Sequence, residues 1–168
     1  GNVLYELDGK PALALYKTYL GERAAGLPTA ALLFPLAILA GDRRVVRTVL
    51  ALDEDGQSMR FAGDIPEGSR VQLMRGNFDR LILGAQGAAT AARGPGPDPV
   101  LALAVSCVGR RLLMKSRIDE ELEATLDALP PETQQIGFYS YGELASAHLG
   151  ACELHNQTMT LTTFSEAA

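Results

Sequence analysis

Residues 45–62, VVRTVLALDEDGQSMRFA, carry the clearest structural signal in the chain. Two runs of strand-forming residues lie on either side of DEDG, where Gly56 can supply the positive φ of a tight hairpin turn. A second turn, DIPEG at 64–68, precedes a third run at 70–74. These signals predict an antiparallel three-strand meander over about residues 45–75.

Three segments outside the meander show the spacing of helices. Residues 11–20 start with Pro11, which suits the first position of a helix, and repeat apolar side chains at helical intervals. Asn77 can cap a second helix, in which apolar residues recur at i, i+3, i+4 and i+7. The third helix is expected at 116–129, where Pro130 follows it.

The other runs read as strands. Residues 101–105, LALAV, are apolar without alternation, which predicts a strand buried on both faces. Further strands are expected at 3–7, 32–40, 136–141 and 154–164, and an internal loop at 93–99, RGPGPDP. Hairpins followed by crossover helices predict an α+β fold, a mostly antiparallel sheet with about three helices packed on it.

Composition narrows the class of protein. The 168 residues suit a single domain, or one lobe of a larger one, with enough length to bury a core. A formal charge of −5 and no stripe of basic residues argue against nucleic-acid binding. No apolar stretch reaches the roughly 18 residues of a membrane span. A start at Gly1, already inside an expected strand, indicates a fragment of a longer protein.

The first polar patch follows the buried strand. It contains Cys107, Gly109, Arg110 and Arg111. Ligand clefts favour the carboxyl ends of strands, and Arg110 beside free backbone N–H groups would suit a carboxylate or phosphate. Alternatively, the two arginines are solvated or pair with Glu120 or Glu121.

A second patch, GFYSYGE, spans residues 137–143. The period of a strand would place Tyr139, Tyr141 and Glu143 on one face, where two rings and a carboxylate could surround an amine. The alternative is a half-exposed strand whose tyrosines pack their rings and hydrate their hydroxyls.

The third patch is His155, Asn156 and Gln157. Alternation would place His155 and Gln157 on the same core-facing row as Met159, so that they need hydrogen-bonding partners from the protein or from a ligand. Asn156 would lie on the opposite face. Structural hydrogen bonds within the protein are the alternative role for His155 and Gln157.

Catalytic patterns are weak, so we expect no enzyme. Cys107 and His155 could form a pair, but no third group orients them and the thiol is expected to be buried. His148 and Cys152, with these two, match no zinc-binding spacing. The sequence therefore predicts no metal site, no catalytic residue and no cofactor.

Five ordered blocks together resemble the C-terminal region of FIST domains, named for F-box and intracellular signal transduction proteins. The blocks are LDGKPAL at 7–13, RFAGDIPEG at 60–68, SCVGRR at 106–111, GFYSYGE at 137–143 and CELHNQT at 152–158. They span almost the whole chain, which makes the combination far more specific than any single block.

The resemblance implies a bacterial, cytoplasmic sensory domain. Such domains are proposed to bind small ligands, with amino acids as the leading suggestion, and to act with an N-terminal FIST half or a signalling output domain. We therefore expect residues 1–168 to form a single C-terminal FIST domain or lobe, with the N-terminal half absent. The alternative is a protein-interaction module that docks the second half or a signalling partner and has no small-molecule site.

Overall fold

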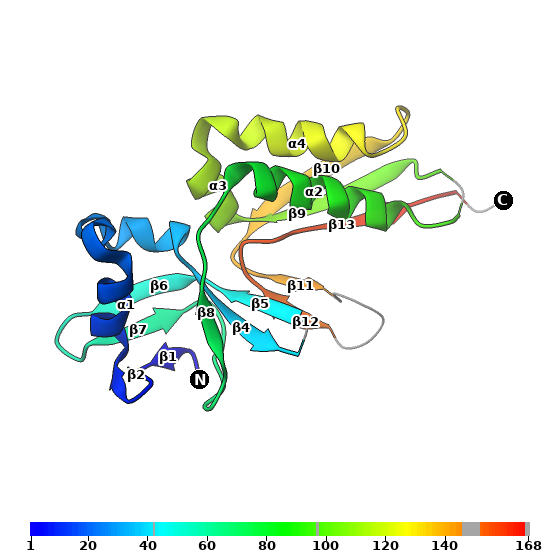
Figure 1. Ribbon diagram of the computed structural model, residues 1–168. Helices are drawn as coiled ribbons and strands as arrows, with labels where there is room; N and C mark the ends of the chain where they lie inside the picture. Colours follow the sequence, from blue (N-terminus) through cyan, green and yellow to red (C-terminus); the bar gives the residue numbers. More distant parts are fainter. Residues whose placement is uncertain (42, 97, 146–151, 167–168) are drawn as a thin grey trace. The chain divides into compact units, whose positions relative to one another are not determined.

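The fold is α+β, and most strand pairs are antiparallel, as the sequence predicts (Figure 1). A computed structural model describes residues 1–41, 43–96, 98–145 and 152–166. The chain divides into two compact units, Gly1–Gly76 and Asn77–Ala168. Each unit has its own buried core.

The first unit contains two three-strand sheets, ordered β1-β7-β6 and β5-β4-β8, and the short hairpin β2–β3. Its strands are β1 (Val3–Leu4), β2 (Glu6–Leu7), β3 (Lys10–Pro11), β4 (Leu36–Ala40), β5 (Arg43–Arg47), β6 (Val49–Asp53), β7 (Ser58–Phe61) and β8 (Val71–Leu73). Its helices are α1 (Ala12–Leu20) and two 3-10 helices, η1 (Gly21–Gly26) and η2 (Thr29–Leu33).

The expected meander is only partly correct. The hairpin β6–β7 forms around the predicted turn, with Asp53 opposite Ser58. The run 45–52, however, is broken at Thr48, so that β5 and β6 belong to different sheets. The third strand, β8, pairs with β4 instead of β7. A tight turn forces its two strands together, whereas the nine-residue connection 62–70 leaves β8 free to pair elsewhere.

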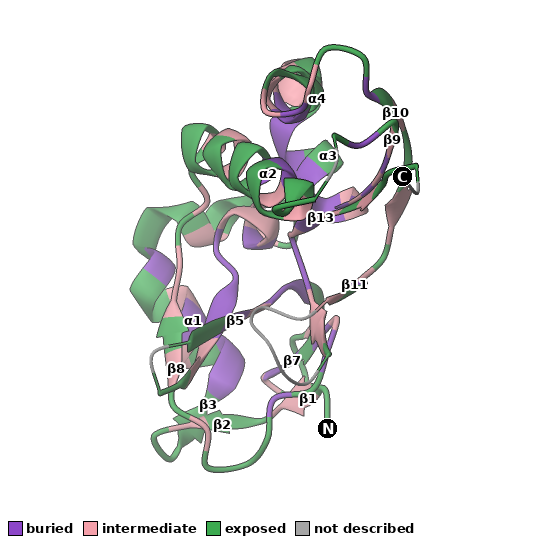
Figure 2. Cartoon of the chain, turned by 90° about the vertical axis from the view of Figure 1, so that its right-hand side faces the viewer, coloured by how far each residue is buried: buried purple, intermediate pink, exposed green. Residues whose placement is uncertain are grey.

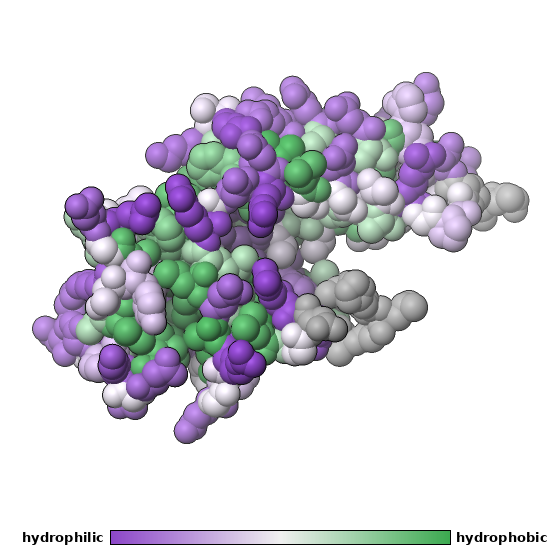
Figure 3. Space-filling model, in the orientation of Figure 1, coloured by the Kyte–Doolittle hydropathy of each residue, from purple (hydrophilic) through white to green (hydrophobic). Residues whose placement is uncertain are grey.

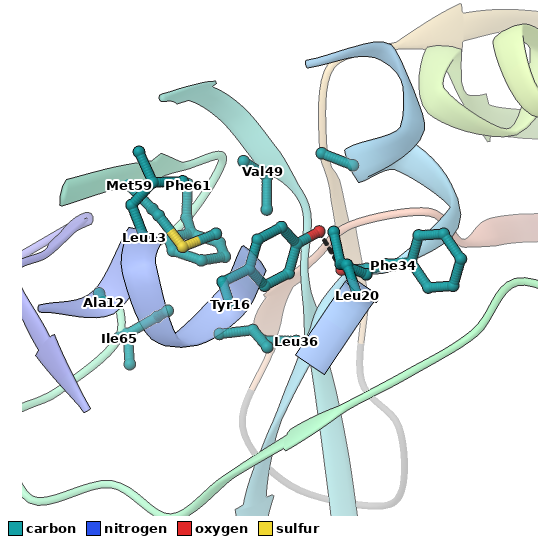
Figure 4. Close-up of a cluster of buried hydrophobic side chains, with 11 residues drawn as sticks. Ala12, Leu13, Tyr16, Leu20, Phe34, Leu36, Val49, Met59, Phe61 and Ile65 are labelled. Atoms are coloured by element: carbon teal, nitrogen blue, oxygen red, sulfur yellow. Dashed lines mark hydrogen bonds between the residues drawn. The ribbon is translucent and has the colours of Figure 1, made fainter. Parts of the chain in front are cut away.

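The core of the first unit forms where α1 packs its apolar stripe against strands of both sheets (Figure 4). Leu13 and Tyr16 of α1 are at most 2% exposed, and so are Met59 and Phe61 of β7. The hydroxyl of Tyr16 donates to the carbonyl of Phe34 at 2.8 Å, which satisfies the one polar atom of that ring. Burial raises the pKa of Tyr16.

The second unit contains a three-strand sheet of order β10-β9-β13, a two-strand sheet β11–β12, and three α-helices among the described residues. Its strands are β9 (Leu101–Cys107), β10 (Gln134–Ser140), β11 (Glu143–Ala145), β12 (Glu153–His155) and β13 (Met159–Phe164). Its helices are α2 (Phe78–Arg93), α3 (Val108–Met114) and α4 (Ile118–Asp127), with the 3-10 turn η3 (Lys115–Arg117) before α4.

Strand β9 is central in its sheet, but the predicted burial on both faces holds for one face only. Ala102, Ala104 and Ser106 are buried, whereas Leu101, Leu103 and Val105 on the other face are half-buried. It pairs in parallel with β10 and antiparallel with β13. The parallel pairing follows from the crossover through α3 and α4, which returns the chain to the same end of the sheet. The carboxyl ends of β9 and β10 therefore lie side by side.

Helix α2 starts where the sequence predicts, because Oδ1 of Asn77 accepts the backbone N–H of Arg80 at 2.9 Å. Its buried residues Ala85 and Ala89 pack on the sheet face that carries Ala102 and Ala104. Most other residues of α2 are exposed or half-buried (Figure 2). In the loop expected at 93–99, the described residues after Arg93 are in neither helix nor strand.

Candidate functional site

The three polar patches meet at one end of the sheet in the second unit. Tyr139 and Met159 flank Ser106 in register on either side of β9. The backbone N–H of Cys107 donates to the carbonyl of Thr158 at 3.0 Å, and Glu143 pairs with His155 between β11 and β12. Residues from all three patches therefore surround the carboxyl ends of β9 and β10.

Arg110 takes the second of the two roles that the sequence allows, an ion pair with Glu121. Its Nε donates to Oε1 of Glu121 at 2.9 Å, and Nη1 and Nη2 donate to the carbonyls of Gln157 and Leu81 at 3.2 and 2.7 Å. The Oγ of Ser106 donates to the same Glu121 oxygen at 3.0 Å. Arg110 is 3% exposed and Glu121 is fully buried, so this network ties α2, α3, α4 and β9 together from within.

The expected common face of Tyr139, Tyr141 and Glu143 does not form. Strand β10 ends at Ser140 and β11 begins at Glu143, so the two-residue period does not continue through the patch. Tyr141 is 86% exposed, whereas Glu143 is buried and accepts the hydroxyls of Ser140 and Thr158 at 2.5 and 2.7 Å. The Glu143 carboxylate thus joins β10 to the segment before β13 through these two hydroxyls.

Tyr139 and Arg111 form the solvent-accessible side of the group of polar-patch residues around the ends of β9 and β10. The guanidinium carbon of exposed Arg111 lies 4.9 Å from the centre of the half-buried Tyr139 ring, within cation–π range. Partial burial raises the pKa of the Tyr139 hydroxyl, and the charge of Glu121 acts in the same direction while Arg111 opposes it. Arg111 is therefore a cation of the cluster that solvent and small molecules can reach.

The third patch is also rearranged relative to the sequence prediction. The expected strand 154–164 is interrupted, because β12 ends at His155, β13 begins at Met159, and Gln157 between them has a φ of 54°. His155 and Gln157 therefore do not continue the core-facing row of Met159. Asn156, expected on the opposite face, is fully buried, and its amide donates to the carbonyl of His155 at 3.1 Å.

Cys107 is buried at the junction of β9 and α3 and is 4% exposed. Burial raises the pKa of its thiol, and the charge of Glu143 adds to this, while the backbone N–H groups of Gly109, Arg110 and Gln157 act in the opposite direction. Gly109 packs closely against it, since a Cβ there would lie 3.6 Å from the Cys107 sulfur. His155 instead has its Nε2 3.2 Å from the carbonyl of Ala145.

We predict that Cys107 reacts slowly with iodoacetamide at neutral pH, because its raised pKa keeps it protonated and its burial blocks access. The exposed thiol of Cys152 is the internal control and should be alkylated first. Peptide mass spectrometry over a time course measures both rates in one sample. Faster alkylation of Cys107 than of Cys152 would indicate an activated thiol and revive the cysteine-enzyme hypothesis.

A pocket of about 320 Å³ lies beside this cluster, between α4 and strand β10. Ser106 and Tyr139 link it to the polar network, and the remaining lining is mainly apolar. The lining residues are Ala104, Ser106, Leu122, Leu126, Gln135, Ile136, Gly137, Phe138, Tyr139 and Met159. The sequence patterns did not predict most of these residues as pocket residues. The glycine at position 137, inside a predicted strand, could have indicated a close approach of two backbones.

Two buried oxygens at or behind this pocket have no hydrogen-bond partner among the described residues. One is Oε1 of Gln135, which lines the pocket, and the other is Oε2 of Glu121, which adjoins the lining residue Ser106. Buried polar atoms are normally paired, so the oxygen of Gln135 could accept a hydrogen bond from a molecule in the pocket. Glu121 is fully buried and does not line the pocket.

The comparison with protein families gives a match over most of the chain. The family model of the FIST C domain matches residues 12–146. The chain belongs to the FIST C family. Membership of this family is consistent with a signal-transduction sensory domain. No curated protein and no solved structure matches the FIST C chain.

The part of the FIST C domain that the structure describes contains neither a membrane-spanning helix nor a metal-binding group. None of its helices combines the length and the apolar character that a membrane crossing requires. No group of three or more His, Cys, Asp or Glu side chains in the described ranges is arranged to hold a metal ion. His148, considered above as a ligand, lies outside the described residues.

Proposed function

We propose that this FIST C domain senses a small molecule that binds in the pocket between α4 and β10. The observation that carries the proposal is the pocket itself, whose volume lies at the lower end of the range for small-ligand sites. Its lining is mainly apolar with a few polar groups, which is the usual composition of such sites. Tyr139 of the second polar patch and Ser106, next to the first, line the pocket.

The chemistry around the pocket supports an amino acid as the ligand class. The unpaired oxygen of Gln135 is an acceptor and would favour an ammonium group, while the apolar wall from Leu122 and Leu126 would receive a side chain. Arg111, accessible beside Tyr139, would attract the carboxylate. Arg111 thus replaces Arg110 in the role that the sequence first suggested.

The proposed role in the cell is signalling, not catalysis, and it includes no cofactor. Binding would act by favouring one arrangement of this domain relative to an N-terminal FIST half or an output domain in the cytoplasm. Such a shift requires that the ligand bind the two arrangements with different affinities.

We predict that a subset of amino acids raises the thermal unfolding midpoint of this chain and that Leu126→Trp abolishes the rise. A ligand at one hundred times its Kd stabilises the folded state by about 2.7 kcal/mol. The larger indole would fill the pocket from a position that is 46% exposed, so the unliganded midpoint should change little. Differential scanning fluorimetry against the twenty amino acids measures both effects.

Leu83→Trp is the matched control, because Leu83 is 62% exposed on α2 and does not line the pocket. It should keep the ligand-induced rise in full. The natural sequence contains no Trp, so the fluorescence of each introduced indole also reports its own environment. No rise with any amino acid, or a rise that survives Leu126→Trp, would refute this site.

A further inference from the structure

Strand β10 is an unprotected sheet edge. Among the strands of the described residues it pairs only with β9, and its seven residues, QQIGFYS, carry no charge and no proline. Ile136 and Phe138 on it are each 58% exposed. Proteins usually protect exposed edges with Lys, Pro or bulges, because unpaired backbone N–H and C=O groups are a template for another strand.

The pocket includes this edge and also reaches β9 and β13 through Ala104, Ser106 and Met159. Five consecutive residues, 135–139, line it from β10, and Leu122 and Leu126 line it from α4, one helical turn apart. A groove between an edge strand and a helix suits an extended peptide, which hydrogen-bonds to the edge and places alternate side chains in the groove. The unpaired Oε1 of Gln135 could accept a further N–H from such a peptide.

Acidic side chains predominate around the groove, although exposed Arg111 stacks on the lining residue Tyr139. Acidic residues outnumber basic ones by five over residues 77–168, whereas the two balance over residues 1–76. Asp119, Glu123 and Asp127 are exposed along α4, and exposed Glu132 immediately precedes β10. Figure 3 shows the hydrophilic side chains along α4 at the top of the view. A basic partner would be attracted to this face. A second copy of this chain would instead place its own acidic helix against the acidic residues of α4, which is unfavourable.

We propose that β10 receives an extended, basic segment of a partner protein as an added strand. One apolar side chain of the segment enters the pocket, and flanking Lys or Arg residues lie near the acids of α4 and Glu132. The proposal depends on the edge, the groove and the charges, and it does not require the small ligand. Because both occupants use the pocket, an amino acid bound there would displace the segment.

The test uses fluorescein-labelled seven-residue peptides with alternating Thr and a central Val, Leu or Phe, flanked by Lys at both ends. We expect at least one to bind this chain about tenfold more tightly than its Glu-flanked counterpart, with the difference decreasing in high salt. N-methylation of alternate backbone amides should abolish binding, since it removes the donors to β10. Leu126→Trp should weaken binding at least tenfold, and Leu83→Trp should not.

Fluorescence anisotropy measures these affinities in the absence of amino acids, so the result does not depend on the small-ligand proposal. Equal binding of the Lys- and Glu-flanked peptides, tolerance of N-methylation, or no binding by any peptide would overturn the added-strand proposal. Sedimentation velocity on the unliganded chain tests whether a second copy of the chain, instead of a partner protein, binds the edge. A dimer that Leu126→Trp dissociates would assign the edge to a second copy instead.

Discussion

Arg110→Ala is expected to lower the free energy of unfolding of the second unit by about 3–5 kcal/mol. The substitution removes three donors and leaves Glu121, which is fully buried, with an uncompensated negative charge. The carbonyls of Gln157 and Leu81 lose a donor at the same time. Urea unfolding followed by circular dichroism measures the change.

Arg111→Ala is the matched control, since the neighbouring arginine is exposed and its guanidinium lies over the face of Tyr139. It should cost no more than about 1 kcal/mol. The double variant Arg110→Met/Glu121→Leu replaces the whole ion pair. It should recover most of the free energy of unfolding lost in Arg110→Ala, because no buried charge remains. A fully stable Arg110→Ala variant that no longer responds to ligand would instead assign Arg110 to ligand binding.

Gly137→Ala is expected to destabilise the second unit by about 3 kcal/mol. A Cβ at this position would lie 2.2 Å from the carbonyl oxygen of Ala104 and 3.1 Å from its carbonyl carbon. These are backbone atoms of the central strand, so neither can move aside without separating β10 from β9. Thermal unfolding by circular dichroism measures the loss.

Gly87→Ala provides the opposite case in the same unit. Gly87 lies inside α2, and a Cβ there would meet nothing within 4 Å. Alanine in a helix interior is favoured over glycine, so this variant should gain about 0.5–1 kcal/mol. If both variants showed the same small change, the close approach of β10 to β9 at residue 137 would be wrong.

The sequence by itself determined the elements whose signals are local. The turn after Asp53 forms the β6–β7 hairpin, although Gln57 and not Gly56 takes the positive φ. Asn77 caps α2. Both features depend on residues close to one another in the chain. The unbroken apolar run at 101–105 was enough to predict the strand that is central in the second unit, but not its burial, because only the face with Ala102 and Ala104 is buried. The five blocks were enough to indicate the FIST C family.

Local patterns failed where a strand changed direction or partner. Alternation assumes that a strand continues, so it placed Tyr141 beside Glu143, although the chain turns between Ser140 and Glu143. The same assumption joined β12 to β13 across the left-handed backbone of Gln157. The sequence also could not predict that β8 pairs with β4, because a nine-residue connection allows β8 to pair with β4 or with β7.

Only the tertiary structure decided what the polar residues do. Arg110 has the same local sequence whether it binds a ligand or a carboxylate of its own protein, and the choice depends on where α4 places Glu121, eleven residues away. The pocket combines α4, β9, β10 and β13, so no single segment contains its pattern. Hydrophobic periodicity and turn chemistry act over a few residues, whereas burial, ion pairing and cavity shape depend on contacts between distant segments.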